Sequence, residues 1–165
     1  YLAAEFADKE GYTIVHTMEG MDAAMSGVII APREFLTAEN EDTIVKYLEG
    51  AIEVLVWAGK EENQQAGAQA FLQGMKDEFG VELSEEGALQ CMKWIEWPSL
   101  EDLEELCKVG EDGLTGLQRE YQKFYQAHVD IGLQSAADLD KILAGCDSSY
   151  LEKAIANYKE HNGIE

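Results

Sequence analysis

The sequence predicts an α/β fold in which two short β-strands come first and a series of helices follows. Two runs near the start, residues 12–17 and 27–31, are rich in β-branched and aromatic residues, which is typical of strands. From Asn40 onward, apolar residues recur at helical spacing instead. Because two short strands do not form a stable sheet alone, we expect the chain to be a mostly helical fragment whose strands need partners from outside it.

The first elements are short and are separated by a long loop. Residues 1–9 have the pattern of the last turns of a helix, which Gly11 ends. The strands YTIVHT (12–17) and GVIIA (27–31) follow, and no hairpin dipeptide joins them. The connecting EGMDAAMS, residues 19–26, is long enough to line a binding site.

Two longer helices are predicted next. The first begins after Asn40, a residue suited to cap it. The second covers residues 63–79, and Gly80 ends it. The apolar stripes expected to face the core are Ile44, Leu48, Ile52 and Leu55 on the first helix, and Ala66, Ala70, Phe71, Met75 and Phe79 on the second.

Serine residues mark the starts of the next two helices. Ser84 is expected to cap a helix that continues through Ile95 and that Pro98 stops, because proline disfavours helical backbone in the residue before it. Ser99 and Asp102 resemble a capping box and open a further helix. The tetrapeptide GEDG, residues 110–113, ends that helix.

The most regular apolar stripe follows GEDG and ends at Gly132. We expect it to pack against the helix that contains Leu48 and Ile52. A connector helix over residues 135–143 and a final helix capped by Asp147 or Ser148 complete the chain. The stripe consists of Leu114, Leu117, Tyr121, Phe124, His128 and Ile131.

The charge of the chain excludes several classes of partner. With 33 Asp and Glu against 12 Lys and Arg, the net charge is -21, which repels a phosphate backbone and anionic lipid. No apolar stretch approaches the roughly 20 residues of a membrane span. We therefore expect no nucleic-acid partner, and contact with a membrane only indirectly, through a transporter or a lipid anchor outside this chain.

The residues that usually carry chemistry show no catalytic or metal-binding pattern. The histidines and cysteines lack the spacings of zinc or thiol sites, and adjacent acids such as Glu61 and Glu62 are explained by solvated helix faces. We expect structural roles for these residues, no metal, no cofactor and no enzymatic activity. The histidines are His16, His128 and His161, and the cysteines are Cys91, Cys107 and Cys146.

Three stretches, taken in order, resemble a known family. They are GYTIVHT (11–17) with SGVIIAPREFLTAENEDTIVKYLEGAIEVLVW (26–57), then IEWPSLEDLEEL (95–106), then SAADLDKILAGCDSSYLEKAI (135–155). Together they are similar to the C-terminal half of the solute-binding proteins of ABC importers for taurine, sulfonates, nitrate and thiamine precursors. Two features depart from the family: the helix after GEDG is longer, and the first lobe and half of the second lobe have no counterpart.

The resemblance implies a fold, a function and a location. The fold is the α/β type 2 periplasmic-binding-protein fold, with residues 1–31 as the end of the second lobe and the return crossing strand, and residues 32–165 as the helical C-terminal part of the first lobe. The implied function is to carry a small solute, of the sulfonate, nitrate or pyrimidine kind, to ABC permease subunits. The implied location is extracytoplasmic, in the periplasm or at the cell surface.

The resemblance also implies a ligand-binding segment just before the return strand. Ser26 is the leading candidate there, although a serine that only starts a strand is the alternative. Methionines in the loop either line the pocket or cover the edge of a core. For Trp94 and Trp97, helix packing is favoured over stacking on a ligand. The candidate ligand-binding residues are Ala24, Met25, Ser26 and Gly27, with Met18 and Met21 nearby.

A second function fits the composition equally well. The chain can be a free-standing acidic helical domain that acts by protein interaction, as an adaptor or a regulatory subunit. The N-terminal residues distinguish the two interpretations, because a complete helical adaptor is not expected to begin with a helix end and two unpaired strands.

Overall fold

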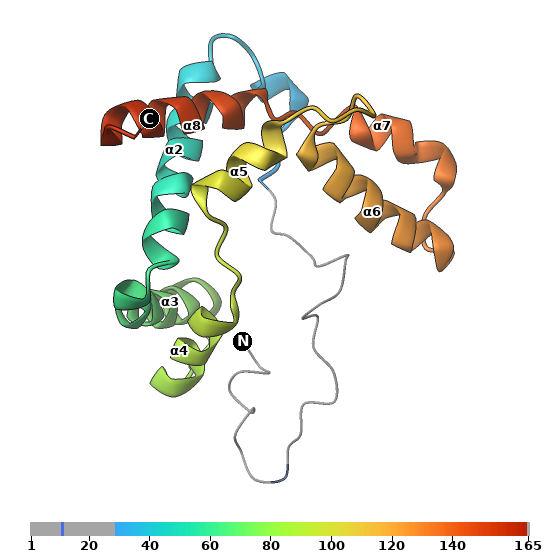
Figure 1. Cartoon of the computed structure of the whole chain (residues 1–165). Coiled ribbons are helices and arrows are strands. Elements are labelled where there is room, and N and C mark those ends of the chain that lie inside the picture. Colours follow the sequence, from blue (N-terminus) through green and yellow to red (C-terminus); the bar gives the residue numbers. More distant parts are fainter. Residues whose placement is uncertain (1–10, 12–28, 165) are drawn as a thin grey trace. The chain divides into compact units, whose positions relative to one another are not determined.

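A succession of helices forms the described part of the chain (Figure 1). The computed structural model describes Gly11 and residues 29–164, and 69% of these residues are helical. The elements in chain order are η1 (Arg33–Phe35), α2 (Glu41–Ala58), η2 (Glu61–Asn63), α3 (Gln64–Phe79), α4 (Glu85–Trp94), α5 (Leu100–Cys107), α6 (Gly116–Asp130), η3 (Ala136–Asp138), α7 (Leu139–Leu143) and α8 (Ser149–Asn162).

The described residues divide into two units. The first, here called the hairpin unit, comprises Val54–Ser99. The second, here called the bundle unit, comprises residues 29–53 and 100–164. Helix α2 is continuous and contributes to both, since its first thirteen residues belong to the bundle unit and its last five to the hairpin unit. All three tryptophans lie in the hairpin unit.

The predicted α/β fold class is wrong. The described residues form no sheet, and their only β pairing is an isolated antiparallel bridge between Val109 and Thr115. Residues 29–31, the end of the second predicted strand, form no strand, and Ile30 is 86% exposed. β-branched residues favour a strand only where neighbouring strands complete its hydrogen bonds, and no described strand pairs with residues 29–31.

Parts of the predicted organisation lie beyond what the structure describes. Residues 12–17 and the first two residues of the second predicted strand, 27 and 28, are outside the described residues. The predicted division of the chain between residues 31 and 32 therefore stays a prediction. Among the described helices, none combines the length and the apolar character needed to cross a bilayer.

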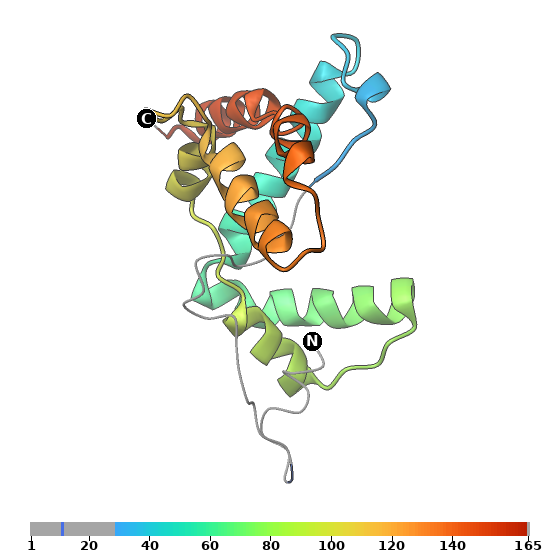
Figure 2. The same ribbon diagram turned by 90° about the vertical axis from the view of Figure 1, so that its right-hand side faces the viewer.

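Helices α3 and α4 form the hairpin that gives the first unit its name (Figure 2). Gly80 ends α3 with a φ of 65°, a left-handed conformation that glycine adopts without strain. The Ser84 hydroxyl accepts a hydrogen bond of 3.0 Å from the Gly87 N–H at the start of α4. Both predicted helix boundaries are thus confirmed.

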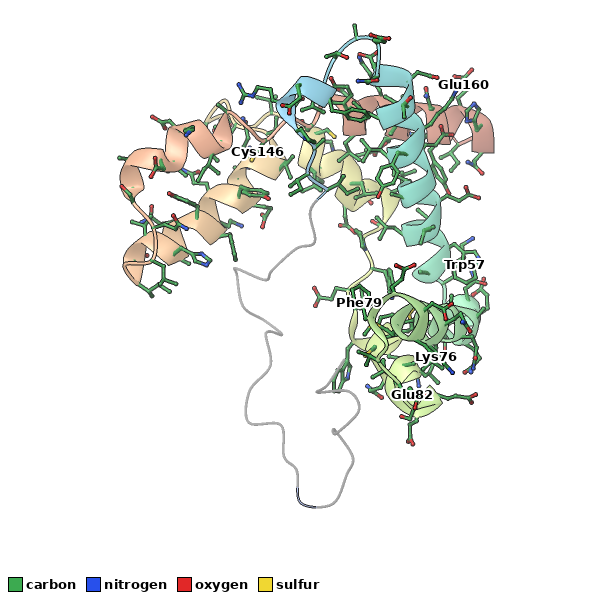
Figure 3. The ribbon with its side chains drawn as sticks, turned by 180° about the vertical axis from the view of Figure 1, so that it is seen from behind. Trp57, Lys76, Phe79, Glu82, Cys146 and Glu160 are labelled. Carbon is green, nitrogen blue, oxygen red and sulfur yellow. The ribbon has the colours of Figure 1, made fainter. Side chains whose placement is uncertain are left out.

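Small side chains form the core of the hairpin unit. Ala58, Ala68, Ala88 and Met92 are buried together, with Phe71, Leu72, Leu89 and Trp97 packed around them. The predicted stripe on α3 is partly wrong, because Ala66 and Ala70 are exposed and Phe79 is 73% exposed at the end of the helix (Figure 3). A Cβ on Gly67 would lie 2.5 Å from Met92 Cε. The two helices therefore approach closely on a face lined by glycine and alanine, which a search for large apolar residues overlooks.

Larger side chains form the core of the bundle unit. Helix α5 packs against α8 and α6, and α6 packs against α7. From α2, Ile52 has only 2% of its surface exposed, which confirms that this residue faces the core. The other buried apolar residues of this unit are Val45, Leu103, Tyr125, Leu143, Ala154, Ile155 and Tyr158.

The orientation of α6 differs from the prediction. Its stripe from Leu114 to His128 is only half-buried and Ile131 is exposed, whereas Tyr125 is buried. The main packing partners of α6 are α5 and α7 rather than α2. The Tyr125 hydroxyl donates a hydrogen bond of 2.8 Å to the Ser135 carbonyl, which allows a tyrosine to take the buried position.

The structure shows how α5 and α8 begin. Helix α5 begins at Leu100, directly after Ser99, as predicted. Ser148 occupies the cap position of α8, but the Asp147 carboxylate accepts the hydrogen bond of 2.9 Å from the Ser149 N–H. Of the two predicted candidates, Asp147 makes the side-chain contact, and Ser148 makes no side-chain cap hydrogen bond.

Candidate functional site

The predicted ligand-binding residues are not among those that the structure describes. Ala24, Met25, Ser26 and Gly27, together with Met18 and Met21, lie outside the described residues, and their role stays a prediction.

The two neighbouring tryptophans can be placed. The Trp97 indole N–H donates a hydrogen bond of 2.9 Å to the Met92 carbonyl, and its ring packs on the hairpin core. This confirms a packing role for Trp97. Trp94 is exposed on the last turn of α4.

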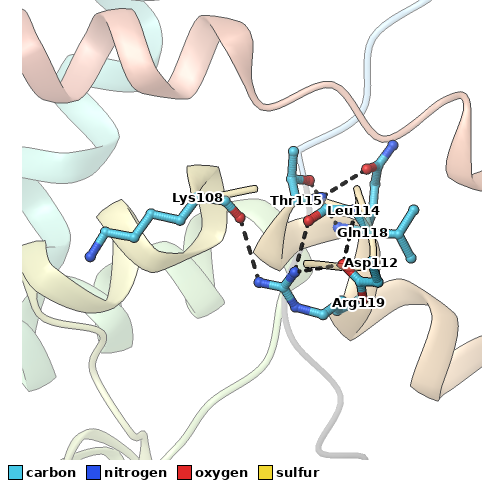
Figure 4. A network of polar contacts seen from close by, with 6 residues as sticks. All are labelled: Lys108, Asp112, Leu114, Thr115, Gln118 and Arg119. Carbon is cyan, nitrogen blue, oxygen red and sulfur yellow. Dashed lines mark hydrogen bonds and ion pairs between the residues drawn. The ribbon is translucent and has the colours of Figure 1, made fainter. Parts of the chain in front are cut away.

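A connected network of polar contacts occupies the loop between α5 and α6 (Figure 4). The loop folds back on itself, since the Gly110 N–H donates to the Leu114 carbonyl at 2.9 Å and the Gly113 N–H donates to the Gly110 carbonyl at 3.0 Å. Gly113 has a φ of 79°, which favours glycine at this turn. The predicted helix breaker GEDG is thus an ordered turn.

The guanidinium of Arg119, from the first turns of α6, fills this loop. Its Nη1 donates to the Leu114 carbonyl at 2.7 Å and lies 3.3 Å from Asp112 Oδ1. Its Nη2 lies 3.5 Å from the Lys108 carbonyl oxygen. The planar donor fork of arginine suits such a set of oxygens, which a single ammonium group could not span.

Two glycines make this arrangement possible. A Cβ on Gly110 would lie 2.3 Å from Arg119 Nη1, so any side chain there would displace the guanidinium. A Cβ on Gly116 would lie 2.2 Å from the Glu105 carbonyl oxygen of α5. Because the obstacle at Gly116 is backbone, the close joint between α5 and α6 requires glycine at that position.

A capping box extends the same joint to α7. The Thr115 hydroxyl accepts from the Gln118 N–H at 3.2 Å, and the Gln118 side-chain oxygen accepts from the Thr115 N–H at 2.9 Å. The Gln118 amide nitrogen also donates to the Leu143 carbonyl at 3.0 Å. One loop therefore fixes three helices of the bundle unit relative to one another.

The sequence patterns considered above did not predict this network, although part of it has a recognisable sequence signature. The pattern Thr115-x-x-Gln118 is a capping-box signature. The pairing of Asp112 with Arg119 has no comparable signature, because it depends on how the turn folds.

The chemistry of the loop is that of a structural joint. Its carbonyl and carboxylate oxygens already bind the guanidinium of the chain's own Arg119. Within the described residues, no group of three or more histidine, cysteine, aspartate or glutamate side chains could hold a metal ion.

Basic side chains of α8 form ion pairs with two other helices of the bundle unit. Lys153 lies 2.7 Å from Glu41 of α2, and Lys159 lies 3.1 Å from Glu104 of α5. His161 contacts Glu49 of α2 through Nδ1. The hydrogen bond and the negative charge of Glu49 raise the pKa of His161 above its ordinary value of 6.5.

The three cysteines are free and half-buried. Burial, with smaller contributions from Glu152 and Glu104, raises the pKa of the Cys107 thiol to about 11. Burial also raises the pKa of Cys146. A thiol with a raised pKa holds little thiolate at neutral pH and is a poor nucleophile, so these two residues fit the structural role predicted for them.

His128 also has local partners. Its Nδ1 lies 2.9 Å from the Phe124 carbonyl oxygen, and its ring centroid lies 4.4 Å from that of Phe124. Both contacts are made within α6, one turn apart, as expected for a structural histidine.

Comparison of the chain with protein-family models, with curated proteins and with solved structures identified no match.

Proposed function

We propose that this chain is part of the solute-binding component of an ABC importer. In this role it carries a small solute, of the sulfonate, nitrate or pyrimidine class, to the permease. The solute is bound and released without chemical change, so the role requires no catalytic residue.

The order of the three sequence stretches along the chain supports the proposal. The Phe35-Leu36 pair that resembles the family's entry element lies ahead of α2, and Trp97-Pro98 precedes α5 by one residue, Ser99. The stretch that resembles the family's ending covers α7 and the first turns of α8. One departure is the length of α5, which has only eight residues where the family has a long helix.

In this role, the described helices act as a rigid scaffold, and other residues contact the ligand. Within the bundle unit, the loop filled by Arg119 and the ion pairs of α8 hold the helices in their relative positions. Contacts with the solute are assigned to Ala24, Met25, Ser26 and Gly27, which stay predicted residues.

Titration calorimetry with taurine, nitrate and an aminopyrimidine tests the proposal. Because the resemblance covers only the C-terminal half of the family, the complete product of the gene is compared with the 165-residue chain. The complete product should bind one class of solute, and at about 100 times its Kd that solute should stabilise the protein by about 2.7 kcal/mol. The 165-residue chain should bind it far more weakly, because it supplies part of the site.

Matched serine variants connect the measurement to the assigned residue. Ser26→Ala should weaken binding by the complete product, whereas Ser149→Ala, at an exposed serine of α8, should not. The proposal fails if the complete product binds none of the three classes. Micromolar binding by the 165-residue chain alone would keep the transport role but refute the assignment of a partial site.

A protein-interaction role is the second candidate, and the surface of the hairpin unit favours it. Phe79 and Trp94 are large apolar side chains exposed at the ends of α3 and α4, and exposed aromatic residues are common in interfaces. The variants Phe79→Ser and Trp94→Ser separate the two functions. If the first proposal is correct, both variants should leave solute binding unchanged. If the protein-interaction role is correct, both variants should stay folded but lose binding to the protein partner.

A further inference from the structure

Asn162 is the last residue of α8 and is followed directly by glycine. It belongs to the only Asn-Gly pair of the sequence, because Glu41, Gln64 and Tyr158 follow the other asparagines. Asn162 is exposed, whereas the other asparagines are half-buried. Its side-chain amide therefore combines a small following residue with access to water. The other asparagines are Asn40, Asn63 and Asn157.

An asparagine in this position can react with the backbone that follows it. The Gly163 nitrogen attacks Asn162 Cγ, and the new bond closes a succinimide ring. The bond between Cγ and Nδ2 breaks, and the amide leaves as ammonia with the proton from the Gly163 nitrogen. Water then opens the ring at either carbonyl, which gives aspartate or isoaspartate. Glycine favours the attack because it has no Cβ to crowd the nitrogen.

In the folded chain, hydrogen bonds hold both reacting groups. Asn162 Nδ2 donates to the Tyr158 carbonyl at 2.8 Å, and the Gly163 N–H donates to the Glu160 carbonyl at 3.3 Å. The backbone of Asn162 is helical, and it must rotate before the ring can close. The reaction therefore requires the last turn of α8 to open, and helix ends open more readily than helix interiors.

A contact with α2 restrains this turn. His161, which directly precedes Asn162, contacts Glu49 of α2 through Nδ1, and α8 lies against α2 (Figure 1). The Glu49 side chain is 19% exposed, so the contact is partly shielded from water. The next ion pair along the helix, Lys159 with Glu104 of α5, lies three residues earlier. Among the described ion pairs, the contact of His161 is thus the nearest to the reacting amide.

We propose that Asn162 is a site of spontaneous deamidation and that the contact of His161 with Glu49 limits its rate. The modification replaces an amide that donates to Tyr158 by a carboxylate that only accepts. It also places negative charge at the C-terminal end of a helix, where the helix dipole disfavours it. Isoaspartate in addition lengthens the main chain by one carbon. Deamidation therefore loosens the end of α8 from α2 irreversibly, with water as the only co-reactant.

Peptide mapping by mass spectrometry tests the proposal. The folded chain and a synthetic peptide of residues 160–165, EHNGIE, are incubated in parallel at body temperature and mildly alkaline pH. The peptide is too short to form a stable helix, so it gives the intrinsic rate. Asn162 of the folded chain should convert roughly tenfold to hundredfold more slowly than the peptide. It should still convert much faster than the other asparagines.

Matched variants of α2 test the role of Glu49. Glu49→Ala removes the carboxylate that contacts His161 and should raise the rate at Asn162 by roughly twofold to fivefold, as expected for the loss of one ion pair. Glu53→Ala removes the same charge from an exposed position one turn further along α2, and it should leave the rate unchanged. Circular dichroism checks that both variants keep their helices.

Three results would overturn the proposal. The first is an Asn162 that converts no faster than the other asparagines. The second is a rate in the folded chain equal to that of the peptide, which would show that α8 does not restrain the reaction. The third is a Glu49→Ala variant that deamidates at the same rate as Glu53→Ala.

Discussion

In the hairpin unit two helices meet through glycine and alanine, whereas in the bundle unit helices meet through larger side chains and are joined by ion pairs. The crossing of α3 and α4 brings Gly67 against Met92. In the bundle unit, α8 contributes Ile155 and Tyr158 to the core and joins α2 and α5 through Lys153 and Lys159. The same acidic composition therefore supports two ways of packing helices.

The comparison separates what stabilises a unit from what orients its helices. Exposed ion pairs contribute little free energy each, and both members of the Lys153–Glu41 pair are substantially exposed. The stability of the bundle unit is therefore expected to rest on its buried apolar residues. Its ion pairs would instead favour one arrangement of helices over others.

The largest expected effect follows from removing a buried side chain of the bundle unit. Ile52→Ala should lower the free energy of unfolding by about 2 to 5 kcal/mol, because it leaves a cavity in the core. Urea denaturation followed by circular dichroism measures this. The matched control is Val54→Ala on the exposed face of the same helix, where a change of roughly 0.5 kcal/mol or less is expected. Equal effects at the two positions would contradict the assigned orientation of α2.

A smaller change in stability is expected when alanine replaces either of the two closely packed glycines. Gly116→Ala should cost about 1 to 3 kcal/mol, because its Cβ would meet the Glu105 carbonyl, which is backbone and cannot move aside. Gly67→Ala should cost less, because Met92 Cε is the end of a flexible side chain and alanine favours a helix over glycine by about 1 kcal/mol.

Thermal unfolding of the two variants makes this comparison. Gly74→Ala is the control, since a Cβ there would meet nothing within 4 Å and should stabilise α3 by up to about 1 kcal/mol. A Gly67→Ala variant as unstable as Gly116→Ala would show that the crossing of α3 and α4 is as rigid as the joint of α5 and α6.

The smallest effect concerns the pH dependence of the bundle unit. Because Glu49 raises the pKa of His161 in the folded chain, this contact contributes stability below the ordinary histidine pKa and loses it as the pH rises through the raised value. The wild type should therefore lose stability relative to His161→Gln when the pH increases across that window. Denaturation curves of both proteins at several pH values, at low salt, measure the difference. A constant difference across the window would refute the contribution of this pair.

Local signals predicted most helix boundaries, because caps depend on neighbouring residues. Gly80, Ser84 and Asp147 each act where the sequence indicates. The faces of the helices were harder to predict, because they depend on partners distant in the chain. Tyr125 is buried because its hydroxyl reaches Ser135, and Gly67 is buried because Met92 packs on it.

The α/β fold class failed for a related reason. A run such as GVIIA predicts a strand from composition, but a strand exists only where others pair with it. The candidate site around Ser26 rested on a resemblance and lies outside the described residues. By contrast, the contact of Asp112 with Arg119 depends on a turn whose shape is encoded by Gly110 and Gly113, and only the folded loop reveals it.

The distribution of aromatic residues makes the two units optically distinct. All three tryptophans belong to the hairpin unit, whereas every described tyrosine belongs to the bundle unit. Fluorescence excited at the red edge of the tryptophan band therefore reports on the hairpin unit alone. Changes in tyrosine absorbance report on the bundle unit together with the two remaining tyrosines of the chain. The unfolding of the two units can thus be followed in one unlabelled sample.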